Sequence, residues 1–222
     1  MKSKVCTRAE IMARFHDGQT VAVGGQANHG APNRLIDCLV RSGARDLTVV
    51  SIDSGDFDCT VGRLVHSGQV KKLITTHIGK NPETVSLLDR GGLEVELVPM
   101  GTLIERLRCG GMGLGGVLTK TGLGTVVAEG KQVVEANGER YLLETALRTD
   151  VSLVRARRGD PMGNLAYRGT SATSNPIIAT CADLTIAEPD FLMELGELTI
   201  DQIATPGVFV DLVLGEGGTG RG

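Results

Sequence analysis

Short apolar runs alternate with longer amphipathic segments along most of the chain. The run at 21–23 lies between polar residues and two glycines, which is typical of a short buried strand. Further apolar runs predict strands at 46–52, 72–76, 93–98, 151–156 and 184–188. Helix-like segments between the strands cover 8–16, 33–42, 61–67, 82–90 and 103–109. This alternation predicts an α/β fold of three layers, in which helices cover both faces of a mostly parallel sheet.

The middle of the chain interrupts this alternation. Residues 110–116 form a glycine tract, which is either a mobile flap or a place where chain segments pack closely. Residues 130–143 alternate like paired strands around Asn137-Gly138, a dipeptide typical of a tight hairpin turn. We therefore expect one domain, 1–222, with a small β excursion over about 117–145 and a flexible tail at 215–222.

Composition narrows the class of protein. The 222 residues carry a net charge of −3 without a prominent basic stretch, and aromatic residues make up only 3%, so nucleic acid is not an expected partner. The five cysteines are far apart and form no metal-ligand pattern, which favours free thiols in a reducing compartment and no bound metal. No apolar run is long enough to span a membrane. These features favour a cytoplasmic protein.

Candidate chemistry starts at the glycine turn that follows the first sheet strand. Gly24 and Gly25 end the strand, a short polar loop follows, and a helix begins near Pro32. Glycines let the backbone approach a ligand closely, and a helix N-terminus offers unpaired N–H groups. Because a parallel sheet binds ligands at the carboxyl ends of its strands, we expect 24–30, 51–55 and 100–102 to share one functional edge. The alternative is a tight connection that binds nothing.

Six segments, taken in order, resemble the alpha subunit of family I coenzyme A transferases, closest to the acetate/acetoacetate (3-oxoacid) type. The turn at 17–32 resembles the family signature D-G-x-x-hydrophobic-G-G-F-x-x-x-G-x-P. The other matching segments are His77-Ile78-Gly79-Lys80-Asn81-Pro82-Glu83, 101–111, 118–125, Gly163-Asn164-Leu165-Ala166-Tyr167 and Asn175-Pro176. The resemblance spans about residues 5–214.

The resemblance implies transfer of coenzyme A from a short acyl- or 3-oxoacyl-CoA to a free carboxylate. The family uses a glutamate nucleophile that forms an acyl-glutamyl anhydride and then a glutamyl-CoA thioester, near an oxyanion hole. In two-chain members this glutamate lies on the beta subunit. The resemblance thus implies an α/β complex, often α2β2, with a CoA thioester as substrate, no metal or redox cofactor, and no nucleophile in this chain.

Three positions depart from the family pattern. Gln26 replaces an aromatic residue, Met100 replaces a glutamine, and Ala172-Thr173-Ser174 replaces the R-N-F of R-N-F-N-P. These changes imply a roomier or more polar acyl pocket than acetate or butyrate needs. A thioether cannot replace an amide donor, so we hypothesise that the Gln26 amide takes over that role. Full activity in Gln26→Ala would contradict this hypothesis.

The candidate substrate-binding residues lie in the glycine turn, at the start of the helix after residue 99, and in the Asn-Pro motif. They are Gly24, Gly25, Gln26, Asn28, His29, Gly30, Met100, Gly101, Thr102 and Asn175. Two of the polar ones have a structural alternative: Asn28 tolerates left-handed backbone, and His29 is an ordinary loop histidine. Glu105 is a possible base, although a first-turn carboxylate paired with an arginine is the simpler explanation.

Two rival functions remain at this point. Met100 and the altered 172–174 stretch favour a divergent acyl-CoA hydrolase, in which Glu105 activates water. A non-catalytic CoA-binding partner subunit is the second rival. A sugar-phosphate isomerase is a weaker possibility, because the turn at 24–30 holds no lysine or arginine for a phosphate.

Overall fold

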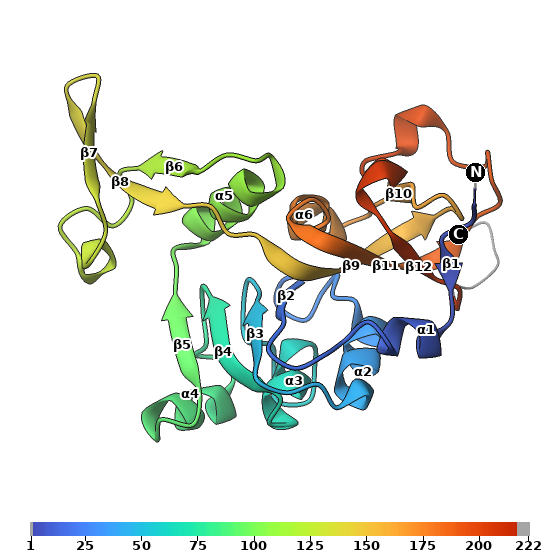
Figure 1. Cartoon of the computed structure of the whole chain (residues 1–222), viewed down its shortest axis with the longest axis horizontal. Coiled ribbons are helices and arrows are strands. Elements are labelled where there is room, and N and C mark those ends of the chain that lie inside the picture. The colour runs from blue at the N-terminus through green and yellow to red at the C-terminus, as the bar shows by residue number, and fades with distance from the viewer. Residues whose placement is uncertain (1, 217–222) are drawn as a thin grey trace.

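The computed structural model describes residues 2–216 and contains a large, almost entirely parallel sheet (Figure 1). Its strands run in the order β1 (Val5–Cys6), β12 (Leu212–Leu214), β11 (Ala182–Leu192), β9 (Thr149–Gly159), β2 (Thr20–Val23), β3 (Leu47–Val50), β4 (Val70–Thr75) and β5 (Glu94–Leu97). Among the described strands of this sheet, only β10 (Leu165–Ala166) pairs antiparallel, against β9. The six strands predicted from apolar runs are all present, and their ends differ from the prediction by at most four residues.

Helices cover both faces of this sheet. One face is packed by α1 (Arg8–Met12), α2 (Asn33–Ser42), α3 (Val61–His66) and α4 (Pro82–Asp89), and the other by α5 (Met100–Gly111) and α6 (Ser171–Ile178). Side chains alternate along β2, so Val21 and Val23 belong to the first core cluster and Ala22 to the second. The three-layer α/β fold is confirmed.

Two helix ends differ from the sequence expectation by three residues or more. Helix α1 ends at Met12, four residues early, because the buried Gln19 side chain accepts a hydrogen bond from His16 N–H (2.9 Å) and donates one to the Arg14 carbonyl (3.2 Å). Helix α5 begins at Met100, three residues early, directly after Pro99 at its N-cap. The expectation that Glu105 lies in the first turn is therefore wrong, because it lies in the second.

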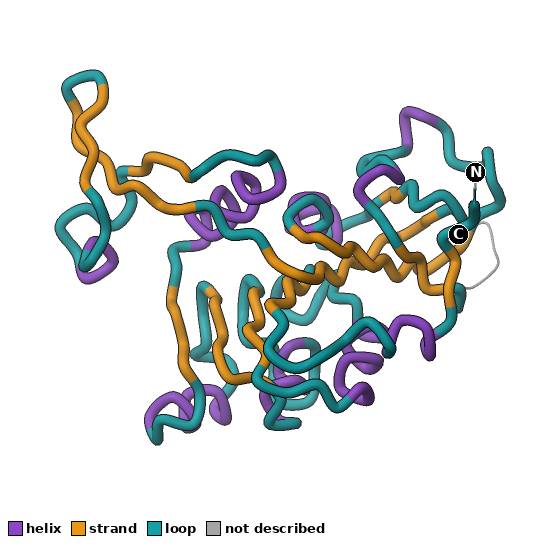
Figure 2. Tube along the Cα trace, viewed as in Figure 1, coloured by secondary structure: helices purple, strands orange, loops and turns teal. Residues whose placement is uncertain are grey.

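A separate three-stranded sheet extends away from the main body (Figure 2). It contains β6 (Gly116–Thr119), β8 (Glu139–Thr145) and β7 (Val133–Ala136), with the short 3-10 turn η1 (Val126–Ala128) between β6 and β7. Asn137 and Gly138 both have positive φ (52° and 74°), as expected for a two-residue hairpin turn. That this sheet is an excursion within a single domain stays a prediction.

The glycine tract at 110–116 serves chain packing at several positions. Gly110 and Gly111 end helix α5, where an added Cβ would lie 2.3 Å from the Leu147 carbonyl oxygen and 2.5 Å from Thr180 Oγ1, respectively. Gly113 and Gly115 have open space around them. Close approach of backbone segments therefore explains part of the tract.

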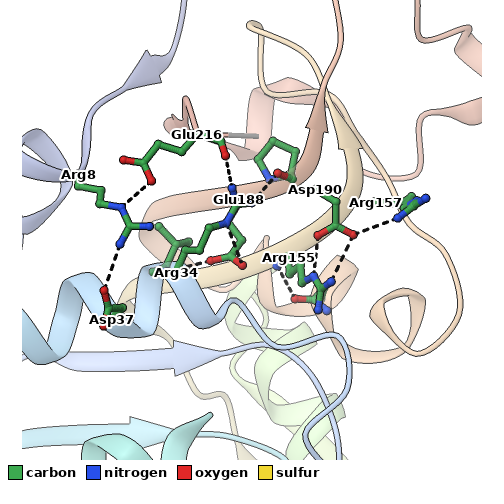
Figure 3. Close-up of polar contacts among 11 residues, drawn as sticks. Arg8, Arg34, Asp37, Arg155, Arg157, Glu188, Asp190 and Glu216 are labelled. Atoms are coloured by element: carbon green, nitrogen blue, oxygen red, sulfur yellow. Dashed lines mark hydrogen bonds and ion pairs between the residues drawn. The ribbon is translucent and has the colours of Figure 1, made fainter. Parts of the chain in front are cut away.

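The end of the described chain is tied to α1 and α2. Arg34 donates to the carbonyl oxygens of Pro189 and Glu216, both at 2.6 Å, and Arg8 joins Glu216 (2.6 Å) to Asp37 (3.1 Å) (Figure 3). Two more 3-10 turns, η2 (Ile200–Gln202) and η3 (Gly207–Phe209), precede β12. Of the expected flexible tail at 215–222, residues 217–222 lie outside the described residues.

Glu188 of β11 is a buried carboxyl group beside these contacts (Figure 3). It accepts a hydrogen bond from Leu35 N–H (2.8 Å) and lies 3.6 Å from Arg34 Nε. Burial nevertheless raises the pKa of Glu188 from its usual 4.5 to about 7, and the Leu35 N–H and Arg34 oppose the rise only in part.

We expect Glu188→Gln to flatten the pH dependence of stability. Between pH 4.5 and 7 the unfolded chain loses the Glu188 proton while the folded chain keeps it, so stability falls as pH rises through this window. Relative to the variant, the wild type should lose up to about 3 kcal/mol of unfolding free energy between pH 4.5 and 7. Urea unfolding at both pH values measures this, with exposed Glu129→Gln as control. Parallel profiles for wild type and variant would show that folding does not raise the pKa of Glu188.

Candidate functional site

The loops that follow β2 and β3 meet at the carboxyl edge of the sheet. Ala27 N–H donates to Asp53 Oδ2 (2.6 Å), Asn28 Nδ2 donates to the Asp56 carboxylate, and Asp56 N–H returns a bond to Asn28 Oδ1 (3.2 Å). The side-chain donor and acceptor of Asn28 are thus both used inside the chain. Asn28 holds one loop against the other, and its predicted role in substrate binding stays a prediction.

Residues 26–29 form a very small hairpin. Gln26 and His29 exchange two backbone hydrogen bonds of 2.9 Å, and Ala27 and Asn28 between them have φ of 48° and 66°. This arrangement requires left-handed backbone at two residues that are not glycine, which costs of order 1 kcal/mol each. Thr60, which faces the same loop, has φ 49°. Three of the five non-glycine residues with positive φ in the described chain therefore gather here, as strained residues do at functional sites.

The hairpin exposes two polar side chains. Gln26 lines a cavity of about 10 Å³ together with Gly24, Ser51 and Asp53, which leaves room for at most one water molecule. No side-chain partner within residues 2–216 engages the Gln26 amide or the exposed His29 ring. Both groups are therefore available to a ligand, and their predicted role in substrate binding stays a prediction.

Asn175 lies beneath the glycine turn and is fully buried. Its amide donates to the Gly30 and Ser171 carbonyls (both 3.0 Å), and its Oδ1 accepts from Arg155 N–H (2.9 Å). A Cβ on Gly24 would lie 1.9 Å from Asn175 Oδ1. Asn175 thus fixes the position of the turn from below, and direct contact with substrate stays a prediction.

The other glycines of the turn also serve close packing. A Cβ on Gly25 would meet Ala31 backbone atoms at 2.8 Å, and one on Gly30 would meet the Ser171 backbone at 2.8 Å. Both glycines have positive φ, 105° and 68°. Their presence is explained by the fold without a ligand, so only Gln26 and His29 present functional groups at this turn.

The residues at the start of α5 belong to a different cavity. Met100, Gly101, Thr102 and Glu105 line a space of about 540 Å³, most of whose remaining wall comes from β6. Glu105 is half-exposed and pairs with Arg108 at 3.0 Å, as its structural interpretation predicts. Gln26 and Met100 thus line two different cavities. The segments 24–30, 51–55 and 100–102 nevertheless follow the carboxyl ends of the parallel strands β2, β3 and β5, and that they form one functional site stays a prediction.

Sequence reasoning missed a third place, next to the hairpin. Arg157 and Arg158 at the carboxyl end of β9 and Arg168 before α6 line a cavity of about 290 Å³. Arg157 and Arg168 also line an adjacent cavity of about 210 Å³ that reaches His29. The available signal was Arg155-Ala156-Arg157-Arg158, a basic cluster at the end of a predicted buried strand.

Two further findings bear on the type of site. Among residues 2–216, no cluster of three or more His, Cys, Asp or Glu side chains is arranged to hold a metal ion. Within the same residues, no helix combines the length and the apolar character needed to cross a membrane. All five cysteines are free, and four of them are buried.

Comparison with known proteins identifies the family. A family model described as coenzyme A transferase matches residues 6–216. The alpha chain of the acetate CoA-transferase of Escherichia coli K12 is 49% identical over 214 residues, which cover 96% of this chain and 97% of that protein. One chain of a probable succinyl-CoA:3-ketoacid coenzyme A transferase of Bacillus subtilis is 45% identical, over 95% of this chain and 89% of the relative.

A solved structure shows the same fold. The acyl-CoA transferase of Escherichia coli O157:H7, determined as a thioester complex with CoA, matches with a TM-score of 0.84 at 21% identity. The match covers 96% of this chain and 47% of that enzyme, so this chain spans about half of its length. The strained turn at the carboxyl edge of β2, the parallel three-layer fold and the match over nearly the whole sequence lead to one conclusion: the chain belongs to the coenzyme A transferase family.

Proposed function

We propose that this chain is the alpha subunit of a two-chain CoA transferase, which moves CoA from a short acyl- or 3-oxoacyl-CoA to a carboxylate. The observation that carries the proposal is the 49% identity to the alpha chain of an acetate CoA-transferase, over 96% of one chain and 97% of the other. A beta subunit would complete the enzyme, with α2β2 as the proposed stoichiometry. The chain would act in the cytoplasm, where its free thiols stay reduced.

The carboxylates near the hairpin support a nucleophile on the partner. Asp53 accepts from Ala27 N–H (2.6 Å) and Gly55 N–H (2.9 Å), and Asp56 is bonded to Asn28. A carboxylate that accepts such bonds is a weaker nucleophile, because the bonds stabilise its charge. Glu105 faces the other cavity and is paired with Arg108. These contacts support what the family resemblance implies, that the attacking glutamate lies on the beta subunit.

The proposed cycle balances without a cofactor. The partner glutamate attacks the thioester carbonyl carbon, a C–O bond forms, and the C–S bond breaks to release CoA thiolate. The thiolate attacks the glutamyl carbonyl of the resulting anhydride and expels the donor carboxylate, which leaves glutamyl-CoA. The acceptor carboxylate then repeats the two steps in reverse and regenerates the glutamate. Since no oxidation state changes, we propose neither a redox cofactor nor a metal.

This chain would supply one wall of the site. The unpartnered Gln26 amide can donate to an acyl oxygen, while the half-exposed Met100 offers an apolar surface and no donor. Exposed apolar side chains such as Met100 and Leu118 line the cavity between α5 and β6. An apolar surface of this kind is typical of a face that another subunit covers.

CoA transfer by the purified chain, alone and co-expressed with its beta subunit, tests the proposal. With acetoacetyl-CoA as donor and a panel of carboxylate acceptors, we expect transfer only from the complex. Release of CoA without an acceptor would favour a hydrolase, and Glu105→Gln would then abolish it. A complex that forms but transfers CoA to no acceptor would favour the non-catalytic subunit.

A further inference from the structure

Four arginines from residues 155–168 gather beside the hairpin at 26–29, which is distant from them in the sequence. Arg155, Arg157 and Arg158 lie at the carboxyl end of β9, and Arg168 lies just before α6. Together they line the two adjacent cavities of about 290 and 210 Å³. Such a concentration of positive charge is unexpected in a chain whose net charge is −3.

Asp190 offsets part of the positive charge of Arg155 and Arg157. Asp190 accepts two hydrogen bonds from Arg155, from Nε (2.9 Å) and Nη2 (3.3 Å), and lies 3.6 Å from Arg157 Nη1 (Figure 3). Arg155 and Asp190 therefore offset each other. None of the residues that line the larger cavity, which include Arg157 and Arg158, is acidic.

Arg157 and Arg168 are incompletely engaged by the chain. The Arg157 guanidinium stacks 4.5 Å from the centre of the Phe191 ring, and its buried Nε has no hydrogen-bond partner in the described structure. Arg168 is exposed, and its guanidinium makes no hydrogen bond or ion pair with another described residue. A guanidinium group with free N–H donors can bind a planar anion through two parallel hydrogen bonds.

The smaller cavity joins the arginines to the proposed acyl wall. His29 and Gly30 of the glycine turn line it, together with Thr170 and Ser171 at the N-terminus of α6. Helix α6 has no side-chain cap at this end, so its positive dipole end adds to the arginine charge. Because Asp190 also lines this smaller cavity, an anion is better placed in the larger one, which shares Arg157 and Arg168 with it.

We propose that this arginine pocket binds the second carboxylate of a dicarboxylic acid, whose first carboxylate is the one that reacts. The proposal rests on the proposed transferase function and names its substrate class. The relative at 49% identity is named for acetate, and the relative at 45% identity is named for succinyl-CoA. Sequence identity alone therefore does not decide whether the substrate of this chain carries one carboxylate or two. The pocket does choose, because a monocarboxylic acid of similar length would leave Arg168 without an anionic partner.

A carboxylate fits this position better than the phosphates of CoA. The pantetheine arm separates those phosphates from the thioester, whereas the pocket adjoins the turn where the acyl end is proposed to lie. Two small adjoining cavities also suit a compact anionic group better than a nucleotide.

Succinate and butyrate are matched acceptors for the test, because they differ by a carboxylate in place of a methyl group. In the complex with the beta subunit, Arg168→Gln and Arg157→Gln should each lower the ratio of kcat/KM for succinate over butyrate by about 10- to 100-fold. Arg90→Gln, the same charge change at an exposed position beyond α4, should leave the ratio unchanged.

Calorimetric binding of the two acids to the complex separates the pocket from catalysis. We expect succinate to bind at least tenfold more tightly than butyrate, and Arg168→Gln to abolish the difference. Three outcomes would overturn the proposal. The first is that neither variant changes the kcat/KM ratio of succinate over butyrate or the difference in binding between the two acids. The second is an equal loss of kcat/KM for both acceptors with a KM that rises for acyl-CoA but not for dephospho-CoA analogues, and the third is dissociation of the beta subunit from the variant complexes on gel filtration. A wild-type complex that binds succinate selectively but transfers no CoA would contradict the transferase function and leave the pocket supported.

Discussion

Gly24→Ala is expected to lower the free energy of unfolding by about 3–5 kcal/mol and to abolish CoA transfer. The added Cβ would lie 1.9 Å from Asn175 Oδ1 and 2.7 Å from its Cγ, distances that no packing arrangement tolerates. Asn175 is fully buried and has no free space to move into without breaking its bonds to Gly30, Ser171 and Arg155. Each buried polar group left unpaired costs about 1–3 kcal/mol. Urea unfolding monitored by circular dichroism measures the loss.

Two further variants keep this prediction specific. Gly101→Ala adds the same methyl group inside helix α5, where nothing lies within 4 Å, and should be neutral or stabilising by up to about 1 kcal/mol. Gly24→Ala combined with Asn175→Ala removes the clash, so the double variant should lose less stability than the sum of its single changes. Additive losses, or a Gly24→Ala protein as stable as wild type, would mean that the turn is not held through Asn175.

The core of the fold was predictable because buried parallel strands have a strong signature. β2, β3, β4 and β9 are apolar runs between polar or glycine-rich ends, and each lies in the middle of the sheet. Helix α2 matches its predicted bounds because Leu35, Ile36 and Leu39 mark one face and Gly43, with φ 74°, ends it.

The missed elements depend on pairings across the whole chain. β1 and β12 are only two and three residues long, and they exist because Val5 pairs with Val213, more than two hundred residues away. Helix α6 is rich in Ser and Thr and contains Pro176, so its local propensity argues against a helix. A local window of sequence therefore predicts neither the short strands β1 and β12 nor helix α6.

The candidate site was likewise predictable only in part. The glycine turn was predictable as a place, but the reason for Gly24 lies at Asn175, which belongs to another element. The basic residues of β9 were visible as a cluster, whereas the cavity they form also needs Arg168 and His29. Residue types indicated where chemistry was available, and only the fold determined which groups share a cavity.

Lys131→Met is expected to destabilise the three-stranded sheet by about 3–5 kcal/mol. Lys131 Nζ lies 2.6 Å from Glu144 Oε1, and the Glu144 side chain is only 2% exposed. Removal of the lysine would leave a buried carboxylate without a partner, which costs more than the pair contributes when intact. Hydrogen exchange of residues 116–145, together with limited proteolysis, should show opening of this sheet while β2 and β9 remain protected.

The matched control is the double variant Lys131→Met and Glu144→Leu. It replaces the ion pair by apolar side chains of similar size, so it should recover most of the lost protection, because a buried ion pair and its apolar replacement are often close in stability. A double variant as open as Lys131→Met would show that the sheet needs the charge pair itself and not only the absence of an unpaired charge. Since Thr121 and three residues of β6 line the cavity beside Met100, opening of this sheet should also reduce CoA transfer by the complex, which links the stability of the excursion to the proposed function.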